Sequence, residues 1–119
     1  MRRLLLLLLA AVGLGVVASA AASSAPVGPL PAGPTSSITT QRNELVAVAL
    51  PHRAGGRVWR IARAFNSSVV REVSEADVGS NVVIVFRAAG SGTATVKFGL
   101  TKGETAKAFE SRTFRITVK

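Results

Sequence analysis

The stretch Asn81-Val82-Val83-Ile84-Val85-Phe86-Arg87-Ala88 decides the fold, because it is apolar on both of its faces. Successive side chains of an extended chain point to opposite sides. One face therefore carries Val82, Ile84 and Phe86, and the other carries Val83 and Val85. Such a pattern is typical of a strand in the centre of a sheet or covered on both sides. We expect a β-strand here, with further strands packed around it.

Segments on either side of this stretch repeat the period of two. Thr93–Leu100 and 112–119 alternate apolar and polar residues, as half-buried strands do, and 45–50 resembles the central stretch. Weaker strands are predicted at 58–62 and 69–73, with a short edge strand at 37–41. Turn residues separate these segments, and no long helical stripe interrupts them. The pattern predicts six or seven antiparallel strands in an all-β sandwich, with a brief helical turn at 74–77.

The first 22 residues have the features of an export signal. Arg2 and Arg3 precede the apolar run 4–17, and Ala18-Ser19-Ala20 offers a small-residue cleavage site. We expect a periplasmic or secreted protein with no stable membrane insertion after cleavage. An uncleaved membrane anchor is the alternative reading.

Residues 23–37 are rich in Pro, Ala and Ser, a composition typical of an extended spacer. This division gives a signal peptide at 1–22, a linker at 23–37 and a folded domain at 38–119. The domain is close to the lower size limit for a core that is stable by itself.

Composition excludes most chemistry. The 119 residues include no cysteine and one histidine, which removes disulfides, thiolate metal sites and a cysteine nucleophile. His52 and Asp77 lack a serine in a nucleophile-elbow motif. Glu72 and Glu75 are separated by two residues, and no apolar pocket is evident that would raise the pKa of either. We therefore expect no enzyme, no cofactor and no metal.

The charge balance favours an acidic partner. Without Arg2 and Arg3, 13 of the 15 Lys and Arg remain against 6 Asp and Glu, which is +7. A cluster of arginines lies around Gly55-Gly56 and in the strand predicted after it, and could form a basic patch. Its members are Arg53, Arg57, Arg60 and Arg63. The export signal and the lack of aromatic residues at stacking positions argue against nucleic acid.

Three stretches resemble the chagasin-type inhibitors of cysteine proteases. Glu44–Pro51, followed by a loop ending in Gly56 and then by Trp59, is similar to the family's "GE-hydrophobic-LP" strand and "NPTTGY.W" loop. Residues 83–97 look like its "F...A...G...I.L.Y" strand pair, and 114–118 like its "F.V.V" strand. The resemblance covers about residues 42–119 and implies an immunoglobulin-like β-sandwich.

The resemblance also implies a site. Members of the family place three loops from one end of the sandwich across the cleft of a papain-like protease. The corresponding residues here are His52, Arg53, Ala54, Gly55 and Gly56 with Trp59, then Val78, Gly79 and Ser80, then Leu100, Thr101, Lys102 and Gly103. The family's Asn-Pro-Thr-Thr and Arg-Pro-Trp residues are replaced in this sequence.

Two functions remain open from the sequence. The first is an exported, monomeric inhibitor whose partner is a papain-like cysteine protease. The second is a non-inhibitory periplasmic immunoglobulin-like module that docks an acidic partner through the arginine-rich surface.

Overall fold

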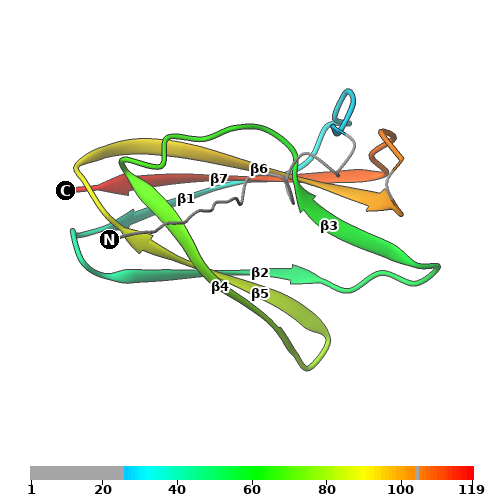
Figure 1. The fold of residues 1–119 in the computed structure, drawn as a ribbon, viewed down its shortest axis with the longest axis horizontal. Coiled ribbons are helices and arrows are strands. Elements are labelled where there is room, and N and C mark those ends of the chain that lie inside the picture. The colour runs from blue at the N-terminus through cyan, green and yellow to red at the C-terminus, as the bar shows by residue number, and fades with distance from the viewer. Residues whose placement is uncertain (1–25, 104) are drawn as a thin grey trace, which may run out of the picture.

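The computed structural model describes residues 26–103 and 105–119, so the predicted signal peptide and the first residues of the predicted linker lie outside the described range. The described residues form seven strands in two sheets, without a helix. No helix in these residues is therefore long and apolar enough to cross a membrane. The expected all-β sandwich is confirmed (Figure 1).

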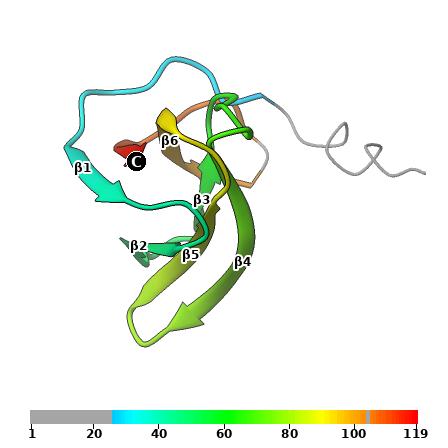
Figure 2. The same ribbon diagram turned by 90° about the vertical axis from the view of Figure 1, so that its left-hand side faces the viewer.

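One sheet has four strands in the order β1-β7-β6-β3, and the other has three in the order β2-β5-β4. The strands are β1 (Thr35–Thr40), β2 (Leu45–Pro51), β3 (Arg57–Ile61), β4 (Val70–Val78), β5 (Asn81–Ala88), β6 (Gly92–Lys102) and β7 (Glu110–Val118). All pairs are antiparallel except β1 with β7, which is parallel. Seen end-on, β3 and β4 lie at one side of the sandwich and β1 and β2 at the other (Figure 2).

The central strand is confirmed as β5, which pairs with β2 on one side and with β4 on the other. Its inward residues Ile84 and Phe86 are buried, whereas Val83 and Val85 on its other face are half-buried. The double apolar pattern thus reflects a central position within the three-stranded sheet.

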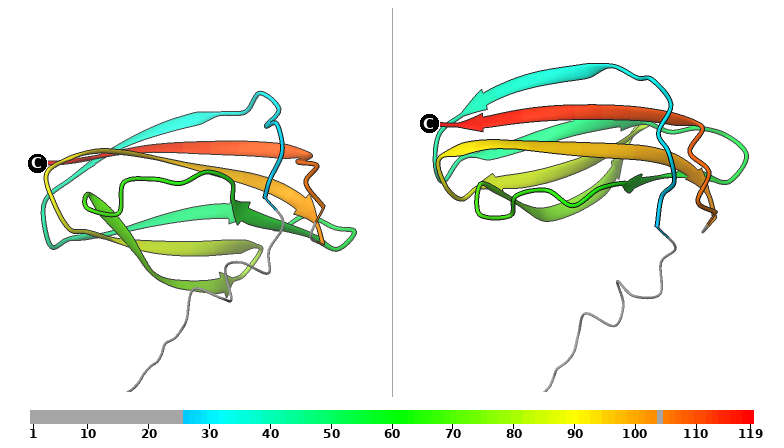
Figure 3. Two further views of the ribbon diagram at one scale, coloured as in Figure 1. Left: turned by 45° about the horizontal axis from the view of Figure 1, so that its top comes forward. Right: turned by 90° about the horizontal axis from the view of Figure 1, so that it is seen from above.

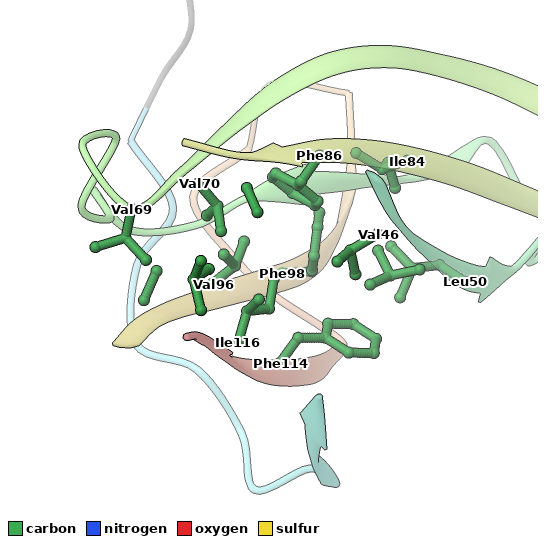
Figure 4. Close-up of a cluster of buried hydrophobic side chains, with 14 residues drawn as sticks. Val46, Leu50, Val69, Val70, Ile84, Phe86, Val96, Phe98, Phe114 and Ile116 are labelled. Atoms are coloured by element: carbon green, nitrogen blue, oxygen red, sulfur yellow. The ribbon is translucent and has the colours of Figure 1, made fainter. Parts of the chain in front are cut away.

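The core lies between the two sheets and is built from alternate residues of the strands (Figure 4). Phe86 of β5 packs edge-to-face on Phe65, with ring centroids 5.9 Å apart. Phe98 of β6 and Phe114 of β7 form a second such pair at 5.8 Å. These four rings pack with aliphatic residues from both sheets, and no disulfide contributes to the core.

The predicted helical turn at 74–77 is wrong, because β4 continues through it to Val78. A bulge between Glu72 and Ser74 shifts the pairing with β5 by one residue. The shift interrupts the alternation of inward and outward side chains along β4. A sequence pattern with a period of two therefore does not detect the second half of the strand. Pairing with β5 then outweighs the local capping tendency of Ser74.

The described part of the proline-rich segment, residues 26–37, is packed on the sandwich, although the sequence predicts a spacer there. β1 begins at Thr35, before the expected domain boundary at residue 38. The backbone N–H of Thr113 donates to Pro34, and the Ser111 hydroxyl donates to Pro31 at 2.6 Å. A Cβ at Gly33 would approach the Ser111 carbonyl oxygen to 2.1 Å, so only glycine fits this close contact.

Arg63 holds the start of this segment in place. Its guanidinium donates to the carbonyl oxygens of Val27 at 3.0 Å and Gly28 at 2.9 Å. The Gly28 N–H in turn donates to the Ala106 carbonyl oxygen at 2.7 Å.

Replacing Arg63 by alanine should speed hydrogen exchange at the Gly28 amide roughly fivefold, because the lost hydrogen bonds stabilise the closed segment by about 1 kcal/mol. The control is Arg42→Ala in the exposed turn between β1 and β2. Unchanged exchange in Arg63→Ala would show that other contacts hold the segment.

Candidate functional site

Three connections meet at one end of the sandwich (Figure 1). They are the first loop (52–56) between β2 and β3, the tight turn at Gly79 and Ser80 between β4 and β5, and the third loop (103–109) between β6 and β7. Both views in Figure 3 agree that this end lies opposite the C-terminus. The structure therefore gathers all three of the segments that the resemblance selected.

Two contacts fasten the first loop to the tight turn. The backbone N–H of His52 donates to the Ser80 carbonyl oxygen at 2.9 Å. The His52 Nε2 lies 3.2 Å from the Asp77 Oδ1, and both side chains remain largely exposed. The start of the first loop is consequently fixed to the β4–β5 hairpin.

Trp59 supports the first loop from below. Its indole N–H donates to the Pro51 carbonyl oxygen at 2.8 Å, and its ring packs against the core with partial burial. The Arg112 guanidinium lies over the ring, 5.8 Å from its centroid. Trp59 is thus a partly buried residue packed against the core. It braces the loop rather than forming its exposed tip.

An ion pair links the first loop to β7, at the end of the third loop. Arg53 donates two hydrogen bonds to the Glu110 carboxylate, one from Nε at 2.7 Å and one from a terminal nitrogen at 3.0 Å. The hydrogen bond from Arg53 lowers the pKa of the Glu110 carboxyl. A lowered pKa in the folded state means that this link is formed at neutral pH. It weakens as the pH falls through that lowered pKa.

The tip of the first loop requires glycine. Gly55 and Gly56 have φ angles of 82° and 73°, in the left-handed region that other residues adopt only at a cost. A Cβ at either position would meet no atom within 4 Å, so space is available for a side chain. The preference for glycine therefore comes from the backbone conformation alone. The loop is exposed and has a defined shape.

The third loop lies further along the chain than the sequence predicts. Leu100 and Thr101 are fully buried within β6, so neither can contact a partner. Lys102 and Gly103 are exposed as expected. The burial alternation of β6 ends at Phe98, because the next three residues, Gly99, Leu100 and Thr101, are all buried.

The sequence analysis missed Phe109 at the end of this loop. Its ring lies between two cations, with the Arg57 guanidinium 4.3 Å and the Lys107 ammonium 5.1 Å from its centroid. Phe109 precedes β7 by one residue, and a signal for it existed in the sequence as an aromatic residue beside a predicted strand. Together with Lys102, these groups give the loop end a basic surface.

The predicted arginine patch is largely used within the chain. Arg53 pairs with Glu110, and Arg63 holds the proline-rich segment. Arg60 donates to the Thr101 hydroxyl at 3.0 Å and to the Thr105 carbonyl oxygen. Three of the four arginines thus link loops or the proline-rich segment to other parts of the fold.

Glu72 and Glu75 lie beside an apolar cleft, which the sequence did not predict. Burial raises the pKa of the Glu72 carboxyl, and the nearby charge of Glu75 raises it further. No group of three His, Asp or Glu side chains suitable for a metal ion is found in residues 26–103 and 105–119.

Glu72→Gln should stabilise the folded protein at neutral pH. A raised pKa means that ionised Glu72 destabilises the folded state above that pKa, and that the penalty disappears as the pH falls through it. Since the side chain is largely exposed, we expect a gain of at most about 0.5 kcal/mol, or roughly 2–4 °C in Tm. Thermal melts at pH 7 and pH 3.5 test this. A gain of equal size at both pH values would contradict the electrostatic explanation.

The fold is similar to that of solved structures, whereas the sequence alone matches no family model. No protein-family model and no curated protein matches the sequence. The structure is similar to the cysteine protease inhibitor EhICP2 from Entamoeba histolytica, with a TM-score of 0.52 and 17% identity over 71% of this chain and 95% of that one. It is also similar to PbICP-C in complex with falcipain-2, with a TM-score of 0.56 and 13% identity over 81% of this chain and 98% of that one. The resemblance to chagasin-type inhibitors is confirmed at the level of the fold.

Proposed function

We propose that this protein inhibits papain-like cysteine proteases by covering the active-site cleft with its three-loop end. The observation that carries the proposal is the joining of all three connections at one end of the sandwich by specific contacts. The fold is shared with the inhibitor EhICP2 and with PbICP-C, which was solved bound to falcipain-2, a papain-like cysteine protease.

Inhibition by occlusion requires a rigid surface and no chemical step. Loops that are already fixed lose little conformational entropy on binding, and this raises affinity without additional contact area. The His52–Ser80 and Arg53–Glu110 bonds supply such fixation here. The protein then acts reversibly by excluding substrate.

Only part of the predicted site is available for the contact. The proposal assigns contact to exposed residues, which are His52, Arg53, Ala54, Gly55, Gly56, Val78, Gly79, Ser80, Lys102 and Gly103. Trp59 acts as the brace under the first loop. Phe109 with its two flanking cations adds an anchor that takes the place of the family's missing tryptophan.

Inhibition is proposed to take place outside the cytoplasm. The basic, apolar and small-residue regions of the first 22 residues support export to the periplasm or the medium. The partner would be a protease in the same compartment. The inhibitor would act as a monomer, with a single protease-binding site at one end of the sandwich. Detection of the protein in the periplasmic or culture fraction, with a shortened N-terminus, tests this part.

Hydrogen-exchange mapping tests the binding mode. The protein is mixed with papain whose catalytic cysteine carries a small reversible block, which prevents proteolysis and which the protein can displace from the cleft. Protection should fall on 52–56, 79–80 and 103–109. The opposite connections at 41–44 and 89–91 serve as internal controls. Protection confined to those controls would contradict the proposal.

A further inference from the structure

A cleft of about 540 Å³ opens along the side of the sandwich, between the edge strands β3 and β4. Its apolar lining includes Trp59, Ile61, Ile84 and Phe98, and Glu72 and Glu75 line it from β4. A volume of this size falls within the range of about 300–1,000 Å³ that is usual for ligand sites. The strands β3 and β4, whose residues line the cleft, lie together at one side of the sandwich (Figure 2).

The two carboxylates are directed to the inner side of β4 by its register. Glu72 pairs with Phe86 and Glu75 with Ile84, and both partners on β5 are buried inward. The bulge between Glu72 and Ser74 is what places two glutamates, three positions apart, on the same side. The strand irregularity therefore builds a pair of like charges against an apolar surface.

Neither glutamate has a cationic partner among the described residues, whose ion pairs join His52 to Asp77 and Arg53 to Glu110. Arg60 lines the cleft, but its guanidinium donates to Thr101 and Thr105. A cation that enters the cleft would relieve the repulsion between the two carboxylates and offset the loss of solvation of Glu72.

We propose that this cleft binds an arginine side chain presented by an extended segment of a protein partner. Inward charges at a sheet edge normally exclude an added strand. A strand that carries arginine at the facing position would instead be selected, because its guanidinium neutralises Glu72 and Glu75. Arginine fits better than lysine, since its planar fork suits two carboxylates and its plane stacks on an indole such as Trp59.

The cleft also adjoins the loop end. A smaller cavity of about 250 Å³ shares Trp59 and Glu75 with it and extends to His52 and Arg53. Arginine binding would thus be sensed by Trp59, which also braces the first loop through Pro51. The inference does not depend on protease inhibition, because its test contains no protease.

Titration with a matched peptide pair tests the assignment. The probes are acetyl-Gly-Val-Arg-Val-Gly-amide and the same peptide with citrulline, the neutral isostere of arginine. Trp59 is the only tryptophan, so its indole N–H signal in a two-dimensional NMR spectrum is a unique reporter. We expect a saturable shift with the arginine peptide, and at least tenfold weaker binding of the citrulline peptide. Equal responses to the two peptides would overturn the proposal, as would equal binding of arginine amide alone.

Paired variants locate the effect. Glu72→Gln with Glu75→Gln should abolish the response, and the double variant remains folded because it removes an unfavourable charge pair. Glu44→Gln, at the far end of β2, preserves the acceptor for Thr40 and should leave the response unchanged. Binding that survives in the Glu72→Gln/Glu75→Gln variant, with a native spectrum, would exclude this cleft as the arginine site.

Discussion

Replacing Phe86 by alanine should lower the free energy of unfolding by about 3–5 kcal/mol, because a large side chain is removed from a packed core. Phe86 is 0% exposed and has the Phe65 ring edge-on at 5.9 Å. It belongs to the central strand of the three-stranded sheet, so the cavity would lie between the two sheets. For a domain with a total stability of about 5–15 kcal/mol, such a loss leaves a marginal fold.

Chemical denaturation with detection by circular dichroism measures this loss. Val58→Ala is the matched control, since Val58 is an apolar strand residue that is 50% exposed. It should change the free energy of unfolding by less than about 0.5 kcal/mol. If Phe86→Ala costs no more than Val58→Ala, then the core described between the sheets is not what stabilises the protein.

Replacing both Gly55 and Gly56 by alanine should weaken protease inhibition by roughly 30- to 700-fold. Each substitution forces a residue with a Cβ into the left-handed region, at a cost of about 1–2 kcal/mol. The loop tip is exposed, so it relaxes to another conformation instead of unfolding the domain. The cost then appears as lost preorganisation of the inhibitory surface, at tenfold for about each 1.4 kcal/mol.

Inhibition constants together with melting curves measure this effect. Gly92→Ala is the control, because Gly92 also has a positive φ, of 135°, but lies at the opposite end of the sandwich. It should reduce stability and leave the inhibition constant unchanged. An alanine pair at 55 and 56 that inhibits as well as the native loop would show that the first loop does not form the contact.

The sequence predicts the strands best where burial alternates regularly. β5 begins and ends at the predicted residues, and β2 differs by one residue. Prediction fails where the pairing is irregular, as at the bulge of β4, because a shift by one residue reverses which side chains face inward. It also fails at the end of β6, since Thr101 lies on the outer face but is still buried.

The site is predicted in part, for a similar reason. The family resemblance locates the first loop and the tight turn correctly at one end of the sandwich. Contacts between segments that are distant in the chain leave no local pattern. The Arg53–Glu110 pair and the contact of Arg57 with the Phe109 ring are of this kind. The packing of the proline-rich segment also depends on a distant residue, Arg63.

The most direct test of the central claim is a titration of residues 23–119 against papain and a cathepsin-L-like protease, following cleavage of a peptide substrate at two salt concentrations. We predict reversible, competitive inhibition at nanomolar to low micromolar concentration, weaker at the higher salt because the loop end is basic. Absence of inhibition at tens of micromolar, with a folded β-rich domain, would contradict the account and leave only the fold.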